Sequence, residues 1–263
     1  MKKAFFFDID GTLVYPENKQ LVVSKKSIDA INELRSKGHK TFIATGRTEA
    51  FVPNSVYELD MDGFVTANGS VVRIDNKLVY EKLFPEEAIN RVLDFCEQNN
   101  HPWMFEGDKA YVESLESKEL KNFYNSVIVN KEKIIEAKNL DNAIIYNALI
   151  MADYVDLDAL RKALGKGYVV AEHFSCGYVD CYLENHTKAD GISKVIEHLG
   201  LEGYKTYAFG DGNNDLEMFD KVDCGIAMDN ASDKLKAKAS LITKSNFEDG
   251  IFHALKELDL IQF

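Results

Sequence analysis

Apolar and polar residues near the start of the chain follow the pattern of a buried strand, a helix and a second strand. Residues 4–7 are continuously apolar, as in a strand that is buried on both faces of a sheet. A helix is predicted to begin at the N-cap Ser24 and to end near Gly38. A second apolar strand follows at 41–44. This order is typical of a parallel sheet whose strands are connected by helices.

The same alternation recurs in the last third of the chain. Lys188 opens a helix whose apolar residues repeat at i, i+3, i+4 and i+7, namely Ile192, Val195, Ile196 and Leu199. Further strands are predicted at 64–67, 207–209, 224–227 and 241–243. The pattern therefore predicts an α/β fold with a Rossmann-like parallel sheet and helices on both of its faces.

Two pairs of turn residues predict hairpins after the strand at 64–67. Asn68-Gly69 lies between residues with high strand propensity, which is a signal for a two-residue hairpin. Asp75-Asn76 divides a second apolar stretch in the same way. We expect antiparallel strands to follow the parallel ones here.

The middle of the chain has a different order of elements. We predict a helix that begins at Pro85, strands near Trp103, Tyr111, Val169 and Val179, a strand at 144–151 and a helix at 157–164. This α+β order indicates a second domain inserted into the first. The predicted division is a core in two parts, 1–83 and 184–263, and an inserted α+β cap domain at 84–183.

Composition and charge narrow the classes of partner. The chain has 263 residues, a net charge of −12 and four cysteines, none of them in a CxxC pair. Such a charge repels nucleic-acid backbones and anionic membranes on average. No run approaches the roughly 20 apolar residues of a membrane span. We expect a cytoplasmic monomer or weak dimer with reduced cysteines that binds neither nucleic acid nor membrane.

Two carboxylates follow the first predicted strand directly. Asp8 and Asp10, in the sequence DIDGT, are two residues apart, so both side chains point the same way at the carboxyl end of a parallel strand. Crowded carboxylates repel one another and need a cation or a proton between them. Gly11 allows a sharp turn that brings backbone N–H groups close to an anion.

A second acidic turn, GDGNND, follows the strand at 207–209. Asp211, Asn214 and Asp215 supply the carboxylate and amide oxygens that magnesium prefers. A dinucleotide-binding turn is the competing interpretation, but the third glycine of that fingerprint is absent. The sequence therefore predicts a magnesium site rather than a nucleotide site.

Two further positions carry weaker signals. Thr45 and Gly46 end the strand at 41–44 and can hold a phosphate oxygen with a hydroxyl and N–H groups, although a plain turn explains them equally well. Lys188, in the first turn of its helix, is unfavourable against the helix dipole. An exposed, solvated lysine is the ordinary interpretation of such a residue.

In this order, DIDGT, the tripeptide TGR at 45–47, Lys188 and GDGNNDLEMF resemble the four motifs of the haloacid dehalogenase-like hydrolase superfamily. The segment 225–251 is similar to its Cof-type subfamily of sugar- and cofactor-phosphate phosphatases. The inserted region resembles the C2-type cap of that subfamily in position and size. The resemblance implies a phosphatase that acts on a small phosphorylated metabolite, with a sugar phosphate as the first expectation and pyridoxal phosphate or flavin mononucleotide as the second.

The resemblance also implies roles for the motif residues. Asp8 would be the nucleophile that forms an aspartyl phosphate, and Asp10 the general acid and base. Mg²⁺ would be held by Asp8, the backbone carbonyl of Asp10 and Asp211, while Asp215 would act through water or orient Lys188.

By the same resemblance, the phosphoryl oxygens would be held by Thr45, Gly46, Lys188 and Asn214. Positioning and neutralisation of charge are what phosphoryl transfer mainly requires. The second acid of DIDGT separates a hydrolase from a pump, whose aspartyl phosphate must persist.

Two other functions stay open at this point. A phosphomutase of related fold would use the same motifs, and a receiver-like phospho-acceptor module would use a similar set of residues in about half the length.

The inserted region would be a mobile lid that contacts the leaving group. Its polar and aromatic candidates for that contact are His101, Trp103, Glu106, Tyr111, His173, Tyr178 and Asp180.

Overall fold

The computed structural model describes residues 2–129 and 131–262, and it separates into two compact units. The first unit comprises Met1–Gly46, Pro53–Glu81 and His186–Phe263, and the second comprises Arg47–Val52 and Lys82–Asn185. The short segment Arg47–Val52 joins the second unit although it lies in the first third of the chain, which the sequence pattern did not indicate.

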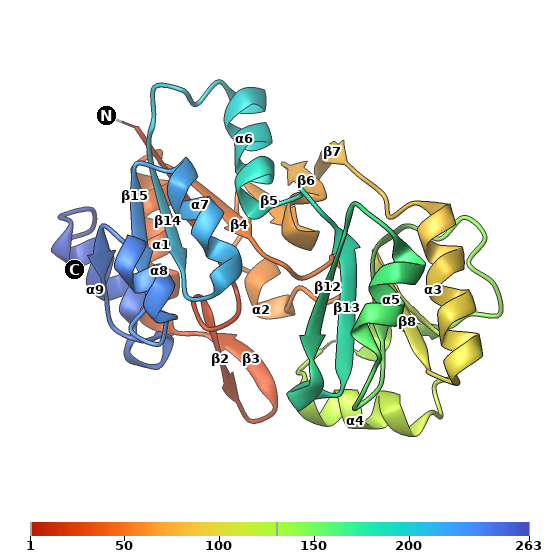
Figure 1. Cartoon of the computed structure of the whole chain (residues 1–263). Helices are drawn as coiled ribbons and strands as arrows, with labels where there is room; N and C mark the ends of the chain where they lie inside the picture. Colours follow the sequence, from red (N-terminus) through yellow and green to blue (C-terminus); the bar gives the residue numbers. More distant parts are fainter. Residues whose placement is uncertain (1, 130, 263) are drawn as a thin grey trace. The chain divides into compact units, whose positions relative to one another are not determined.

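The first unit is built on an eight-stranded sheet with the order β16-β15-β14-β1-β4-β5-β6-β7 (Figure 1). Neighbours from β16 to β5 are parallel, whereas β6 and β7 are antiparallel to their neighbours. The strands are β1 (Lys3–Phe7), β4 (Lys40–Ala44), β5 (Gly63–Thr66), β6 (Val71–Ile74), β7 (Lys77–Glu81), β14 (Lys205–Gly210), β15 (Cys224–Ala227) and β16 (Leu241–Ile242). The predicted α/β fold with a parallel core sheet is confirmed.

Helices cover this sheet. Strand β1 is apolar on both faces because its alternating side chains pack against different neighbours. Phe6 lies in one cluster with residues of α6, α7 and α8, whereas Phe5 and Phe7 stack on Tyr207 and Phe209 of β14. Helices α1 and α9 contact each other, and α1 contacts β4. The helices are α1 (Lys25–Ser36), α2 (Asn54–Tyr57), α6 (Lys188–Leu199), α7 (Leu216–Lys221), α8 (Asp233–Lys238) and α9 (Gly250–Glu257).

The second unit is a six-stranded sheet with helices, in the order β10-β9-β8-β11-β13-β12. Its strands are β8 (Trp103–Gly107), β9 (Ala110–Val112), β10 (Ile134–Glu136), β11 (Ile145–Ile150), β12 (Tyr168–His173) and β13 (Tyr178–Leu183). Its helices are α3 (Glu86–Asn99), α4 (Lys118–Ser126) and α5 (Leu157–Leu164). Residues of α3 and α5 pack in one apolar cluster with one face of the sheet, and residues of α4 pack in another with Met104 and Leu149.

Several local features differ from the sequence prediction. The turn at Asn68-Gly69 does connect antiparallel strands, but Thr66 pairs with Val71, so the connection has four residues and contains a 3-10 turn rather than a two-residue hairpin. The hairpin of β2 (Val14–Glu17) and β3 (Gln20–Val23) and the helix α4 had no counterpart in the prediction. Among the described residues, we find no helix with the length and apolar character needed to span a membrane.

Candidate active site

Asp8 lies at the carboxyl end of β1, in a turn that the backbone holds tightly. The carbonyl of Ile9 accepts hydrogen bonds from the backbone N–H groups of Thr12, Leu13 and Val14. Gly11 has φ +72°, and a Cβ atom at this position would lie 2.2 Å from Asp211 Oδ2, so the turn requires glycine for both reasons. The Asp8 side chain is buried, whereas Asp10 is exposed.

Asp211 and Asp215 lie in the turn after β14, which is the neighbour of β1 in the sheet. The Asp215 carboxylate accepts hydrogen bonds at Oδ2 from the backbone N–H groups of Asp211 and Gly212, each at 2.9 Å. These two bonds fix the turn, and they leave Asp215 Oδ1 directed at the ammonium group of Lys188. Because β1 and β14 are parallel neighbours, both acidic turns occur at one edge of the sheet.

Lys188 is the buried cation of this site, not an exposed lysine. Its Nζ donates to Asp8 Oδ1 at 2.5 Å and to Asp215 Oδ1 at 2.7 Å. The lysine begins α6, where Thr187 and Asp190 form a capping box. The turn before β6 packs closely on this helix start, since a Cβ atom at Gly69 would lie 2.1 Å from the Thr187 carbonyl oxygen.

The acids of the site destabilise one another's charges. Burial raises the pKa of Asp8 well above its usual value, Lys188 opposes this, and Asp215, Asp211 and Asp10 raise the pKa further. Burial works against the charged form of Lys188, but Asp215 and Asp8 outweigh it and raise the lysine pKa. A single ammonium group thus faces several carboxylates.

Asp211 shows the same shortage of positive charge. Burial raises its pKa to about 6, and Asp215 adds to the rise, while the hydrogen bond that Thr12 Oγ1 donates to Asp211 Oδ1 at 2.8 Å lowers it. Oxygen atoms of Asp8, Asp211 and Asp215 lie within 4.8 Å of one another. Hard oxygen donors at this separation, with unbalanced negative charge, fit a divalent cation such as Mg²⁺.

The predicted phosphate-binding residues come together beside these acids. Thr45 is buried at the end of β4, the other neighbour of β1 in the sheet. Gly46 follows it, and a Cβ atom on Gly46 would lie 3.5 Å from Asn214 Nδ2 and 3.0 Å from Asn68 Oδ1. Asn214 itself is exposed. The backbone at Gly46 and the side-chain amides of Asn68 and Asn214 therefore lie near one another. Such groups suit the binding of phosphoryl oxygens.

Two residues that hold the site together were not assigned a function from the sequence. Thr12 is the last residue of DIDGT, and its hydroxyl group fixes Asp211. Asn230 donates from Nδ2 to the carbonyl of Gly11 at 2.8 Å and to Asp211 Oδ2 at 3.4 Å. It lies in the turn after β15, and no local pattern in the sequence points to this contact. Asn230 thus bridges the two acidic turns.

Two of the candidates in the inserted region are partly buried and pack against an apolar cluster of the second unit. They are Trp103 and Tyr111, and the cluster contains residues of α3 and α5. His173 stacks on Tyr178, with ring centroids 4.8 Å apart.

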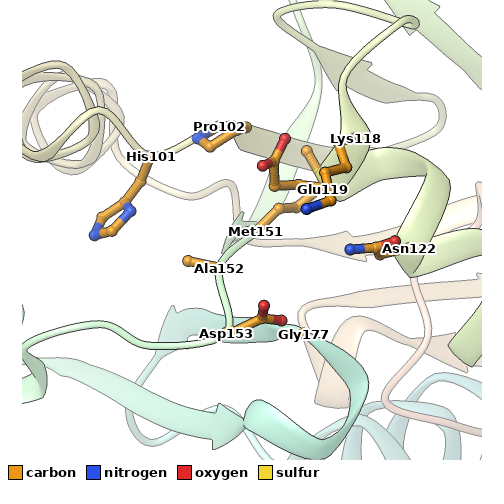
Figure 2. Close-up of a pocket in the computed structure, with 9 residues that line it drawn as sticks. All are labelled: His101, Pro102, Lys118, Glu119, Asn122, Met151, Ala152, Asp153 and Gly177. Atoms are coloured by element: carbon orange, nitrogen blue, oxygen red, sulfur yellow. The ribbon is translucent and has the colours of Figure 1, made fainter.

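His101 lies at a separate pocket of about 150 Å³ in the second unit (Figure 2). In the figure its ring points away from Lys118, Glu119 and Asn122 of α4. None of the motif acids lines this pocket.

Comparison with known proteins gives a family. Residues 5–255 match the family described as haloacid dehalogenase-like hydrolase. A Bacillus subtilis (strain 168) protein named "Putative phosphatase YkrA" is 34% identical, over 99% of both chains. From the same organism, "5-amino-6-(5-phospho-D-ribitylamino)uracil phosphatase YitU" is 28% identical, over 95% of both chains.

A solved structure agrees with these sequence matches. It is that of the sugar phosphatase BT4131, of subclass IIB of the superfamily, with a TM-score of 0.81 and 29% identity, and the match covers 99% of this chain and 100% of the other. The acidic turns and the buried lysine lie in the matched region. The chain belongs to the haloacid dehalogenase-like hydrolases and is a phosphatase of that superfamily.

Proposed function

We propose that this phosphatase hydrolyses the phosphate monoester of a small metabolite, a sugar phosphate first of all, through an aspartyl phosphate on Asp8. The observation that carries the proposal is the position of the Asp8 carboxylate. It is buried at the end of β1, bonded to Lys188 through Oδ1, and close to Asp211 and Asp215. A nucleophile needs this kind of fixed position beside groups that bind its target.

The reaction has two steps that share one acid. In the first step, an oxygen of Asp8 attacks phosphorus and the bond from phosphorus to the leaving oxygen breaks. The protonated carboxyl group of Asp10 donates its proton to the leaving oxygen. In the second step, Asp10 takes a proton from water, the water oxygen attacks phosphorus, and the bond to Asp8 breaks to release phosphate. Asp10 is exposed, which suits a group that exchanges protons with water.

The remaining residues position the phosphoryl group and neutralise its charge. Gly46 and Asn214 supply donors near one another, the preceding residue Thr45 supplies a hydroxyl group, and Lys188 supplies an ammonium group that already contacts Asp8. Mg²⁺, held by Asp8, the Asp10 carbonyl and Asp211, would add positive charge against the transferring phosphoryl group. Asp215 holds Lys188 and the turn that carries Asp211, so it acts through these neighbours.

Metal removal tests the proposed magnesium site. Activity should vanish in EDTA and return with Mg²⁺. Ca²⁺ should inhibit, because it is larger, takes more ligands and tolerates a bidentate carboxylate that would occupy the second oxygen of Asp8. Hydrolysis of para-nitrophenyl phosphate, measured with each ion alone after EDTA treatment, checks this. Full activity in Ca²⁺ alone would contradict the geometry.

A panel of phosphorylated metabolites tests the reaction class. We expect continuous release of phosphate from sugar phosphates in Mg²⁺, without an activating bisphosphate, because Asp10 can activate water. Two relatives suggest the first compounds to try. BT4131 is described as a sugar phosphatase, and the substrate in the name of YitU carries a phosphorylated ribityl chain. Isomerisation of a sugar phosphate that depends on a bisphosphate would indicate a phosphomutase instead. Labelling that stops at one phosphate per chain would indicate a receiver-like module.

A further inference from the structure

The turn between β5 and β6 has an unusual backbone conformation. Ala67, Asn68 and Gly69 have φ +49°, +51° and +91°, so three successive residues lie in the left-handed region. Glycine adopts this region freely and asparagine tolerates it, but the Cβ atom of Ala67 makes it costly there. Contacts around the turn must therefore hold it in place. Strained backbone of this kind is concentrated at functional sites.

The turn is held between two elements of the candidate active site. The backbone N–H group of Asn68 donates to the carbonyl of Thr45, at the end of β4, at 3.1 Å. Gly69 packs on the start of α6, where a Cβ atom would lie 2.1 Å from the Thr187 carbonyl oxygen. Helix α6 lies beside β5 and β6, and it begins with Lys188 (Figure 1). The turn thus contacts both the phosphate-site strand end and the helix that carries the buried lysine.

The side chain of Asn68 lies at the proposed phosphate-binding residues. The position that a Cβ atom on Gly46 would take is 3.0 Å from Asn68 Oδ1 and 3.5 Å from Asn214 Nδ2. Asn68 is half-buried, and within residues 2–129 and 131–262 its side-chain amide forms no hydrogen bond. A half-turn of that amide exchanges its oxygen and its nitrogen, so its NH2 group can face the same point. An amide group without a partner therefore faces the backbone of Gly46.

A phosphoryl group is the ligand that suits such a donor here. Its peripheral oxygens accept hydrogen bonds, and its transfer gains from each donor that is already in position. A neutral amide can bind one of these oxygens without forming an ion pair with the carboxylates of the site. A second ammonium group, in contrast, would be drawn to Asp8, Asp211 and Asp215, which already attract Lys188.

We propose that Asn68 is a further phosphate-binding residue, whose side-chain NH2 group donates to a peripheral oxygen of the transferring phosphoryl group. This inference rests on the proposed function. The left-handed turn serves the contact, because it places the Asn68 side chain beside Gly46 while the backbone of the same residue is bonded to Thr45. Since every substrate has the phosphoryl group, all phosphate esters should depend on Asn68, whatever their leaving group.

The Asn68→Gly variant removes the amide and keeps the turn, because glycine adopts φ +51° without cost. We expect kcat/KM to fall about tenfold to a hundredfold, for para-nitrophenyl phosphate and glucose 6-phosphate alike, since a hydrogen bond to a charged group is lost. The dissociation constant of inorganic phosphate, measured by calorimetry in Mg²⁺, should rise about threefold or more. The smaller change is expected because preorganised donors bind the transition state more strongly than the ground state.

The Asn68→Asp variant separates donation from packing. Aspartate has nearly the shape of asparagine and also tolerates the left-handed region, but it presents a carboxylate in place of the NH2 group. It should lower kcat/KM more than Asn68→Gly does, because the added negative charge repels the phosphoryl group. Measurement at pH 8 favours the ionised carboxylate. If Asn68 only packs on Gly46, Asn68→Asp should be the milder variant, and that order would overturn the proposal.

Asn76→Gly is the matched control for the backbone. Asn76 is exposed in the turn between β6 and β7 and has φ +60°. Both glycine variants gain similar freedom in the unfolded chain, so their unfolding temperatures in EDTA should fall by similar amounts. Asn76→Gly should leave kcat/KM unchanged. Should Asn68→Gly unfold at a much lower temperature, Asn68→Asp still decides, because activity within about twofold of wild type in that variant overturns the proposal.

The outcomes also separate this proposal from the proposed function. If the wild type hydrolyses no phosphate ester in Mg²⁺, the proposed function fails, whereas weaker binding of inorganic phosphate by Asn68→Gly would still support the contact. If the wild type is active and Asn68→Gly stays within about twofold of it, the proposal for Asn68 alone is overturned. A loss confined to glucose 6-phosphate, with para-nitrophenyl phosphate unaffected, would assign Asn68 to the leaving group and would overturn it as well.

Discussion

The Asp8→Asn variant should lose phosphatase turnover by several orders of magnitude while it keeps the fold. Asparagine has nearly the shape of aspartate, and its amide oxygen can still accept the hydrogen bond that Lys188 Nζ donates to Asp8 Oδ1. It cannot form the acyl phosphate, and covalent chemistry has no substitute in the site. Steady-state release of phosphate from para-nitrophenyl phosphate in Mg²⁺ measures the loss.

The stability of this variant supplies the control. Because the pKa of Asp8 is raised in the folded state, the ionised carboxylate destabilises the fold at any pH above the pKa that Asp8 has in the unfolded state. Removing that charge should leave thermal unfolding in EDTA at neutral pH at the wild-type temperature or higher. Activity above a few per cent of wild type, in a protein that is folded by circular dichroism, would show that Asp8 is not the nucleophile.

The two acidic turns could be located from the sequence because the rule behind them is local. An apolar strand predicts its own direction, and the carboxyl ends of parallel strands meet at one edge of the sheet. Asp8 follows β1 and Asp211 follows β14, and the structure brings their oxygen atoms within 4.8 Å of each other. The spacing within each motif was sufficient for this prediction.

Lys188 could not be located in the same way. Its own helix suggested an exposed lysine, yet it is buried because the start of α6 packs on the turn around Gly69 and beside Asp8, 180 residues earlier in the chain. Only the resemblance to the family pointed to it. The role of Asn230 could not be predicted for the same reason, because its partners Gly11 and Asp211 lie 219 and 19 residues away in the chain.

In the second unit, the face of the sheet could not be predicted from one strand alone. Trp103 and Tyr111 were candidates for substrate contact, and both are partly buried against an apolar cluster. Asn147 lies in an otherwise apolar run that predicts a buried strand, and it is buried. Its pairing with Glu106 depends on the register between β8 and β11, which also shifts near Ile145. The α4 helix was missed although Leu120, Phe123 and Tyr124 lie at helical spacing and pack in or against one apolar cluster.

The Lys188→Met variant should lose both activity and stability, and the two losses can be separated. Methionine fills much of the same volume but brings no charge. Removing a preorganised donor from a developing negative charge costs about 10²–10³-fold in kcat. The lysine side chain is 0% exposed and contacts Asp8 and Asp215. Breaking such a buried pair leaves uncompensated charge and costs about 3–5 kcal/mol of folding free energy.

The pH dependence of that stability loss has a definite sign. The folded-state pKa of Asp8 is already raised by burial, with Lys188 opposing the rise, so removal of the lysine raises it further. A carboxyl group whose pKa is higher in the folded state than in the unfolded state makes the fold less stable as the pH rises above the unfolded-state pKa. Thermal unfolding of Lys188→Met in EDTA should therefore approach that of the wild type at pH 5 and fall well below it at pH 8.

A double variant decides whether charge is the cause. Lys188→Met combined with Asp215→Asn removes one of the two carboxylates that lost their partner. Its unfolding temperature at pH 8 should recover a substantial part of the difference, because less uncompensated charge stays buried. Its activity should stay as low as that of Lys188→Met, since the ammonium group is still missing. If the double variant unfolds at the same temperature as the single one at both pH values, the lysine stabilises the fold by packing alone, and the electrostatic account of the site is wrong.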